Sequence, residues 1–194
     1  MMTKKWAFWM MLGCTAQLFA AEQVFVCKES IDQKVHHGDQ GAALRLDYNV
    51  NNGGAFNGFW MKLGPSDKGN NFDASKYKTL TFWLRGDESA GIPSKVKVEL
   101  KNDEAISKKY VESIKPQWTK ISIPLSEFAS QGVDLTKLNE LTIVFEQKEA
   151  APATVGAVYV DDITLEGGSQ TKVLADFNAP APNNVAGNFG AFAP

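Results

Sequence analysis

Short runs of alternating apolar and polar residues, each closed by turn-forming residues, constrain this sequence more than any other feature. In residues 79–85, for example, Leu80, Phe82 and Leu84 alternate with more polar neighbours. A period of two is that of a β-strand, which presents successive side chains to opposite faces. The chain holds about ten such runs and no long stretch with the 3.6-residue period of a helix. These patterns predict an antiparallel β-sandwich or barrel, with helix limited to residues 126–138.

A β-hairpin is predicted near the end of the chain, where residues 156–166 and residues 172–177 are β-type runs on either side of a Gly-Gly turn. Strict alternation places Asp161 on the same face as Ile163 and Leu165. Burial of an unpaired carboxylate is costly. Asp161 is therefore expected to meet a cation, a metal ion or several N–H donors.

Asp161 and Asp176 form the candidate metal site. Across the predicted hairpin the two carboxylates would approach opposite positions, and side by side they repel each other unless a cation lies between them. A Ca²⁺ ion takes about six to eight oxygen ligands, and backbone carbonyls could complete the set. A structural Ca²⁺ is one expectation; the other is that each carboxylate accepts hydrogen bonds from nearby turn N–H groups. The adjacent His36 and His37 point to opposite faces of an extended chain and are expected in a solvated turn rather than at a metal.

Residues 1–20 have the composition of a secretory signal peptide. Lys4 and Lys5 precede a short apolar stretch, and Ala20 fits a small-residue cleavage site. The apolar part is too short for a membrane-spanning helix. A bacterial lipoprotein signal is the alternative, because the residues before Cys14 loosely resemble a lipobox. The first interpretation predicts a secreted or periplasmic protein, and the second an exported protein anchored through Cys14.

Charge and cysteine content exclude several classes of protein. The formal net charge is −2, and removal of residues 1–20 would take away two lysines and no acid. Such a chain lacks the basic surface needed for non-specific binding of nucleic acid or anionic lipid. Cleavage after Ala20 would leave only Cys27, so neither an intramolecular disulfide nor a cysteine–histidine zinc site is expected. The sequence contains no recognised catalytic motif, and we expect no enzyme.

Several stretches of the sequence together resemble one known group of domains. In order and spacing they are similar to the galactose-binding-like jelly rolls, above all to carbohydrate-binding modules of the family-eleven type and the related complex I intermediate-associated domains. This resemblance implies a two-sheet antiparallel β-sandwich, often with a glycan on one concave sheet and often with a structural Ca²⁺. It covers about residues 24–166, nearly the whole mature chain. The stretches are residues 42–48, 58–63, 80–86, 97–101, 118–125 and 158–163.

The chain departs from the family pattern at its ends. Family members usually begin with a strand followed by an Asn-Asn-x-Gly-Gly stretch, whereas here similar residues occur within residues 174–192. We therefore expect a circular permutation, in which residues 172–194 supply the usual N-terminal strand of a single domain over residues 21–194. The alternative is that this tail begins a second, truncated domain. The permutation predicts that residues 189–192 lie near residues 24–27.

Seven outward-pointing residues of the predicted strands form the candidate carbohydrate site. Indole rings stack on the C–H surfaces of sugars, and charged side chains form strong hydrogen bonds with sugar hydroxyls. The prediction assumes that the strands concerned are neighbours in one sheet. The alternative is that the two tryptophans are packing residues and that the charges only solvate the outer face. The seven residues are Trp60, Trp83, Arg85, Arg45, Asp47, Lys97 and Glu99.

The sequence thus predicts an exported, non-catalytic and monomeric carbohydrate-binding module. It would bind a polysaccharide or oligosaccharide on one sheet face and hold a structural Ca²⁺ near Asp161. A protein-interaction or assembly domain with the same jelly-roll fold is the alternative. A glycoside hydrolase is a third hypothesis, and it would need two positioned carboxylates that the sequence alone does not pair.

Overall fold

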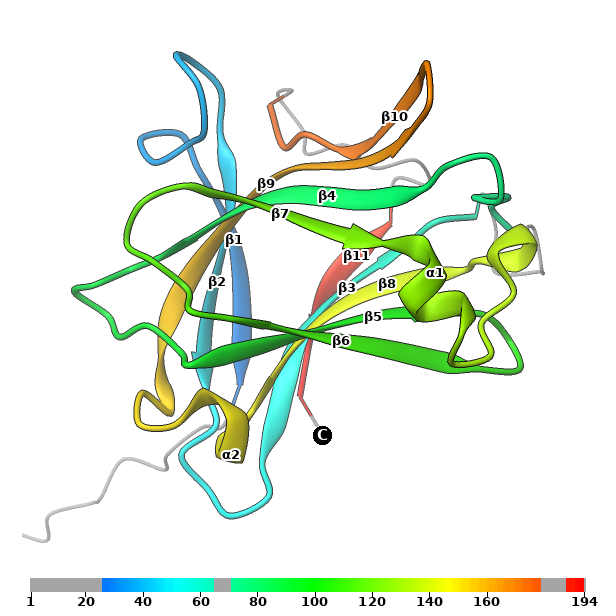
Figure 1. Ribbon diagram of the computed structural model, residues 1–194. Helices are drawn as coiled ribbons and strands as arrows, with labels where there is room; N and C mark the ends of the chain where they lie inside the picture. Colours follow the sequence, from blue (N-terminus) through cyan, green and yellow to red (C-terminus); the bar gives the residue numbers. More distant parts are fainter. Residues whose placement is uncertain (1–25, 65–70, 179–187, 194) are drawn as a thin grey trace, which may run out of the picture.

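The chain folds into two β-sheets that pack face to face (Figure 1). The computed structural model describes residues 26–64, 71–178 and 188–193. The predicted signal peptide, with Cys14, lies outside these residues. Within them no helix has the length and apolar composition to cross a bilayer. The predicted two-sheet antiparallel β-sandwich is confirmed.

The first sheet, sheet A, has the strand order β1-β2-β9-β4-β7, with β10 also paired to β9. All its pairings are antiparallel. The long strand β9 pairs with β2 along its first half and with β10 along its second half. The strands are β1 (Cys27–Asp32), β2 (Ala43–Asn49), β4 (Thr79–Gly86), β7 (Thr119–Pro124), β9 (Val155–Gly167) and β10 (Gln170–Ala175).

The second sheet, sheet B, has the strand order β11-β3-β8-β5-β6 and is also antiparallel throughout. In Figure 1 the last strand, β11, is the red strand beside β3. Within the described residues, helical structure is limited to short pieces, two of which fall at the predicted helical region. The strands are β3 (Phe56–Lys62), β5 (Lys95–Lys101), β6 (Ile106–Glu112), β8 (Glu140–Glu146) and β11 (Phe189–Phe192); the helical pieces are α1 (Leu125–Ala129), the 3₁₀ turn Leu135–Lys137 and α2 (Gln147–Ala150).

Alternate side chains of both sheets fill one apolar core between them. Leu44 of β2 and Phe59 of β3 are fully buried there, as the alternation in the sequence predicts. Tyr48 of β2 stacks on Phe145 of β8, with ring centroids 4.3 Å apart, so the two sheets are joined across the sandwich. Burial of each such side chain contributes about 1.5–3 kcal/mol. The outward-pointing side chains are thereby left for other roles.

A β-bulge at Asp162 interrupts the alternation of β9. The φ angle of Asp162 is 47°, and the register between β9 and β4 shifts at this point. The extra residue turns the strand over, so that Val160 before the bulge and Ile163 after it both face the core. The prediction that Asp161 shares a face with Ile163 and Leu165 is therefore wrong, and Asp161 lies on the outer face of sheet A.

The C-terminal segment belongs to both sheets. Its strand β10 pairs with β9 in sheet A, and its strand β11 pairs with β3 in sheet B. Leu174 and Phe177 lie in the core and are at most 2% exposed. Strand β11 also comes close to β1. Of its predicted neighbours, residues 24–27, only 26 and 27 are described. The circular permutation and the domain boundaries stay predictions.

Replacement of Phe177 by alanine should lower the free energy of unfolding by about 3–5 kcal/mol, because the ring leaves a cavity in the core. Urea denaturation followed by circular dichroism measures the change. The control is Val173→Ala in the preceding strand, where the side chain is 49% exposed. Its effect should stay below about 0.5 kcal/mol. Similar small effects of both substitutions would contradict the packing of the C-terminal segment into the core.

Candidate functional site

The seven predicted site residues divide between the two outer faces of the sandwich. The prediction of one continuous face is wrong, because β2 and β4 belong to sheet A whereas β3 and β5 belong to sheet B. Alternation tells whether a side chain points in or out, but it does not tell which sheet a strand joins. Arg45, Asp47, Trp83 and Arg85 lie on the outer face of sheet A, and Trp60, Lys97 and Glu99 on that of sheet B.

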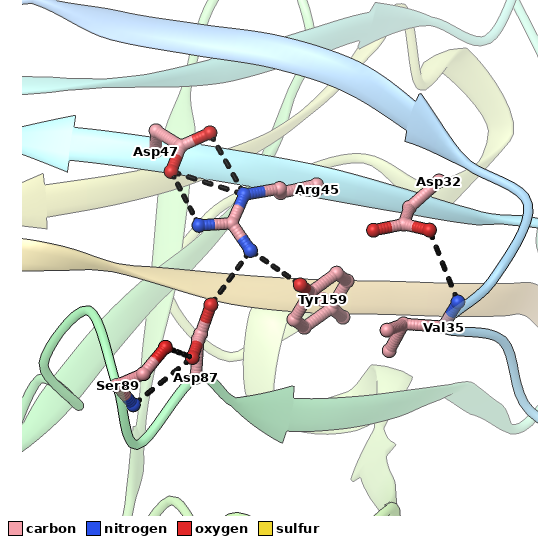
Figure 2. A network of polar contacts seen from close by, with 7 residues as sticks. All are labelled: Asp32, Val35, Arg45, Asp47, Asp87, Ser89 and Tyr159. Atoms are coloured by element: carbon pink, nitrogen blue, oxygen red, sulfur yellow. Dashed lines mark hydrogen bonds and ion pairs between the residues drawn. The ribbon is translucent and has the colours of Figure 1, made fainter.

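On sheet A, the guanidinium of Arg45 is held by acceptors of the same chain (Figure 2). Its Nε and Nη2 donate to Asp47 at 3.0 and 2.7 Å, and Nη1 donates to Asp87 at 2.7 Å and to the Tyr159 hydroxyl. Asp47 raises the pKa of Arg45, and hydrogen bonds from Ser89 and Arg45 lower the pKa of Asp87 to about 2. This cluster joins β2, β9 and the loop after β4, so Arg45 and Asp47 are already engaged in holding the sheet together.

Trp83 is covered by the loop between β1 and β2. The His37 ring stacks on it, with centroids 3.7 Å apart and 17° between the planes. The backbone N–H of His37 donates to Asp161 Oδ2 at 3.0 Å, and its Nδ1 lies 3.2 Å from Asp162 Oδ2. Trp118 meets the same histidine edge-on. The prediction of a solvated turn is therefore wrong for His37, because stacking and two polar contacts hold it against sheet A.

The two candidate metal ligands each have their own N–H partner. Asp161, which is 1% exposed, accepts from the backbone N–H groups of His37 and Asp162, and Asp176 accepts from that of Asn178 at 3.2 Å. Burial raises the pKa of Asp161 to about 6. Among the described residues, no three His, Cys, Asp or Glu side chains are grouped so that they could hold a metal ion. This is the hydrogen-bonded arrangement considered as the alternative; the Ca²⁺ itself stays a prediction.

The outer face of sheet B presents a tryptophan beside a hollow. Trp60 is half-buried, and in the described part of the chain no aromatic ring stacks on its indole. The ammonium of Lys62 lies 5.9 Å from the centre of the ring. Next to the indole is a hollow of about 340 Å³. Its lining residues are Trp60, Lys62, Lys101, Glu140, Thr142 and Phe192.

A ladder of alternating lysines and glutamates crosses this face over β3, β8 and β5. Each of the two inner lysines pairs with two glutamates, so opposite charges balance along the ladder. All the paired N and O atoms are 2.7 to 3.3 Å apart. In order, the ladder runs Lys62–Glu140–Lys101–Glu99–Lys97–Glu146.

The ladder keeps its groups charged although they are partly buried. Burial alone would raise the pKa of Glu99, but hydrogen bonds from Lys97 and Thr142 lower it. Burial alone would lower the pKa of Lys97, but hydrogen bonds to Glu146 and Glu99 raise it. The hydroxyl of Tyr110 donates to Glu146 at 2.8 Å and extends the network to β6. The ladder therefore offers fixed donors and acceptors rather than mobile surface charges.

A second hollow, of about 400 Å³, opens at the other end of the ladder. Phe56, Tyr110 and Glu146 line it together with the turn before β3 and with α2. Phe56 is 44% exposed, which is unusual for a ring of this size. From Thr142 in the first hollow to Glu146 in the second, β8 runs about 13 Å. The outer face of sheet B is thus an elongated surface with a hollow and an aromatic ring at each end.

Sequence reasoning found three members of this surface and missed the others. Trp60, Lys97 and Glu99 were predicted. The members that were not predicted are Phe56, Lys62, Lys101, Tyr110, Glu140, Thr142, Glu146 and Phe192. Glutamates 140 and 146 share the outward parity of β8, and an exposed phenylalanine at a strand start is a recognisable signal. Neither signal shows which strands lie together.

Comparison with solved structures shows the class of fold. The family 11 carbohydrate-binding module from Clostridium thermocellum, solved in complex with a β-1,3-1,4-mixed-linked tetrasaccharide, is 18% identical with a TM-score of 0.54; the match covers 73% of this chain and 83% of that one. The family 30 module of a cellulosomal cellulase of Clostridium thermocellum is 17% identical with a TM-score of 0.54, covering 74% and 84%. An exo-β-agarase matches with a TM-score of 0.57 at 11% identity, over 74% of this chain and 23% of the agarase.

The profile of the family described as "Carbohydrate binding domain 30" matches residues 21–167. The chain belongs to this family and is a carbohydrate-binding module. No sequence among the curated proteins matches it. The predicted relationship to jelly-roll carbohydrate-binding modules is confirmed. The matched region ends at the end of β9, so β10 and β11 lie beyond it.

The buried carboxylate of Asp161 should make stability pH-dependent. Because its pKa is about 6 in the folded chain against an ordinary 3.8, the folded state binds this proton more tightly than the unfolded state. The resulting stabilisation is fully present below the unfolded pKa and is lost as the pH rises through about 6. Relative to Asp161→Asn, the wild type should therefore lose about 2 kcal/mol of unfolding free energy between about pH 4 and pH 7. Urea denaturation of both proteins over this range measures the difference; a constant difference would contradict the burial of the charge.

Proposed function

We propose that the outer face of sheet B binds a neutral polysaccharide or oligosaccharide without cleaving it. The observation that carries the proposal is the contrast between the two tryptophans. Trp83 is stacked by His37 of its own chain, whereas Trp60 lies beside a hollow of about 340 Å³ with no described ring on it. A sugar needs an indole face that is still free.

The outer face of sheet B supplies the two kinds of contact that a sugar requires. The indole offers an apolar surface for the C–H groups of one sugar ring. Lys97 and Lys101 each pair with two glutamates. Since an ammonium has three N–H donors, one remains for a ligand hydroxyl. Because the ion pairs already fix these side chains, little further rotamer freedom is lost on binding.

The balance of charge favours a neutral glycan. A carboxylate or sulfate on the ligand would meet as many glutamates as lysines along the ladder, so it would gain no net attraction. The structural neighbour solved with a β-1,3-1,4-mixed-linked tetrasaccharide supports a β-glucan as the first ligand to test.

The state of the glutamates supports binding without hydrolysis. A glycosidase needs a general acid whose pKa is raised so that it holds a proton. On this face hydrogen bonds from lysines outweigh the effect of burial, and the pKa values of Glu99, Glu140 and Glu146 are all lowered. We propose that any catalytic role belongs to a partner domain or enzyme.

Export, a monomeric state and a structural Ca²⁺ complete the proposal. The composition of residues 1–20 supports export, and a polysaccharide outside the cell is the corresponding ligand. The burial of Asp161 motivates the Ca²⁺, and Asp176 is the second ligand that the sequence suggests. Thermal unfolding with and without a chelator tests the ion: an unchanged melting temperature would remove it from the proposal.

Trp60→Ala should weaken glycan binding at least about tenfold, because a stacked aromatic is the usual anchor of such a site. Affinity electrophoresis through gels containing β-glucans, xylans or galactans measures this as loss of retardation. Trp83→Ala, on the opposite sheet, should keep the retardation. The reverse outcome would place the site on sheet A. Absence of retardation of the wild type by every glycan would favour the protein-interaction domain. Release of reducing sugar would favour the glycoside hydrolase.

Binding should depend little on salt. Raising NaCl from about 50 mM to about 500 mM should change the Kd by less than about twofold, since the ligand is neutral and the paired charges of the ladder are partly buried. Isothermal titration calorimetry with the glycan that gives retardation measures the constants. An acidic polysaccharide such as polygalacturonate serves as the comparison. Tight, salt-sensitive binding of the acidic polymer would contradict the proposed ligand class.

A further inference from the structure

The last strand, β11, forms one side of the surface around Trp60, although it lies beyond the part of the chain that the family profile matches. It pairs with β3 so that Gly190 is opposite Trp60. Residues opposite each other in an antiparallel pair point to the same face. The neighbours of Gly190 in β11, Phe189 and Ala191, pack against the core instead. Gly190 therefore lies on the outer face beside the indole.

Trp60 leans from β3 over Gly190. A Cβ atom placed on Gly190 would lie 3.2 Å from Cζ2 of Trp60 and 3.4 Å from its Cε2 and Nε1. The first distance is shorter than an ordinary van der Waals contact, so a methyl group here requires the indole to shift by a few tenths of an ångström. The backbone of Gly190 is not in the left-handed region. What the glycine provides here is therefore space for the indole and not conformational freedom.

We propose that Gly190 is a positioning residue for glycan binding, because the indole of Trp60 packs directly over it. This inference rests on the proposed function of the outer face of sheet B. Without a side chain at residue 190, the ring lies close over β11 and leaves the hollow beside it open. A larger residue would lift the ring and tilt it toward the ladder, where the sugar would bind. The C-terminal strand thus sets the geometry of the ligand surface.

The test uses the full chain and a graded pair of substitutions. Gly190→Ala should weaken glycan binding about fivefold and Gly190→Val more than about tenfold, because stacking depends on ring placement. In parallel, ¹⁵N NMR follows the indole N–H resonance of Trp60, which is assigned by its loss in Trp60→Phe. This resonance should move in Gly190→Ala, whereas those of Trp83 and Trp118 should not. An unchanged Trp60 resonance in Gly190→Ala would overturn the positioning role of Gly190.

Two comparisons separate the positioning of Trp60 by Gly190 from a general weakening of β11. Ala191→Gly removes a core contact from the same strand, so it should lower the melting temperature and leave glycan affinity unchanged. An equal loss of affinity in this variant would overturn the inference. In a Trp60→Phe background, Gly190→Ala should cause no further loss, because both substitutions act through the same ring. Additive losses would also overturn it.

A wild type that binds no glycan would refute the proposed function, and with it the role of Gly190 in affinity. The NMR measurement would still decide whether Gly190 positions the indole of Trp60, because it needs no ligand. The two failures are therefore distinguishable.

Discussion

Strand β9 is the element on which the rest of the sandwich depends. Three other strands are hydrogen-bonded to it, and its side chains reach the core on both sides of the bulge at Asp162. A strand of this length that alternated strictly would bury the wrong residues along half its length. The bulge corrects this with one extra residue, so that Ile163 and Leu165 return to the core. Asp161, directly before the bulge, points outward and accepts from the backbone of His37. The same strand therefore fills the core and fastens the loop over sheet A.

The two outer faces use similar residue types for different purposes. On sheet A, Arg45 is engaged by Asp47, Asp87 and Tyr159, and His37 covers Trp83. Arg85 lies over the Tyr159 ring, and its buried Nε has no hydrogen-bond partner among the described residues. On sheet B the charges are paired too, but the indole and the two hollows remain open. A composition rich in tryptophan and charge thus does not locate a binding surface. What locates it is which rings the chain leaves uncovered.

The sequence predicted the fold more completely than the candidate site. Period-two runs with their turns predicted most strands of the sandwich, because burial of one face imposes that period. Strand β1 carries no alternating run that would predict it, since most of its residues are polar and exposed at a sheet edge. Trp60 and Trp83 were both correctly read as outward, yet they lie on opposite sides of the molecule. Which sheet a strand joins is decided by long-range pairing, of which a local pattern carries no trace.

The ion-pair ladder has a consequence for how this surface can be dissected. Lys101 serves Glu99 and Glu140 together, and Lys97 serves Glu99 and Glu146. Truncating either lysine would take one partner from two acids at once. The measured loss would therefore report the disruption of several partners and not the worth of one contact. In an alanine scan of the ladder, the summed losses of binding free energy would exceed the total binding free energy. Double-mutant cycles are needed to apportion the energetics of this surface. In each cycle a lysine and one of its two glutamates are replaced singly and together.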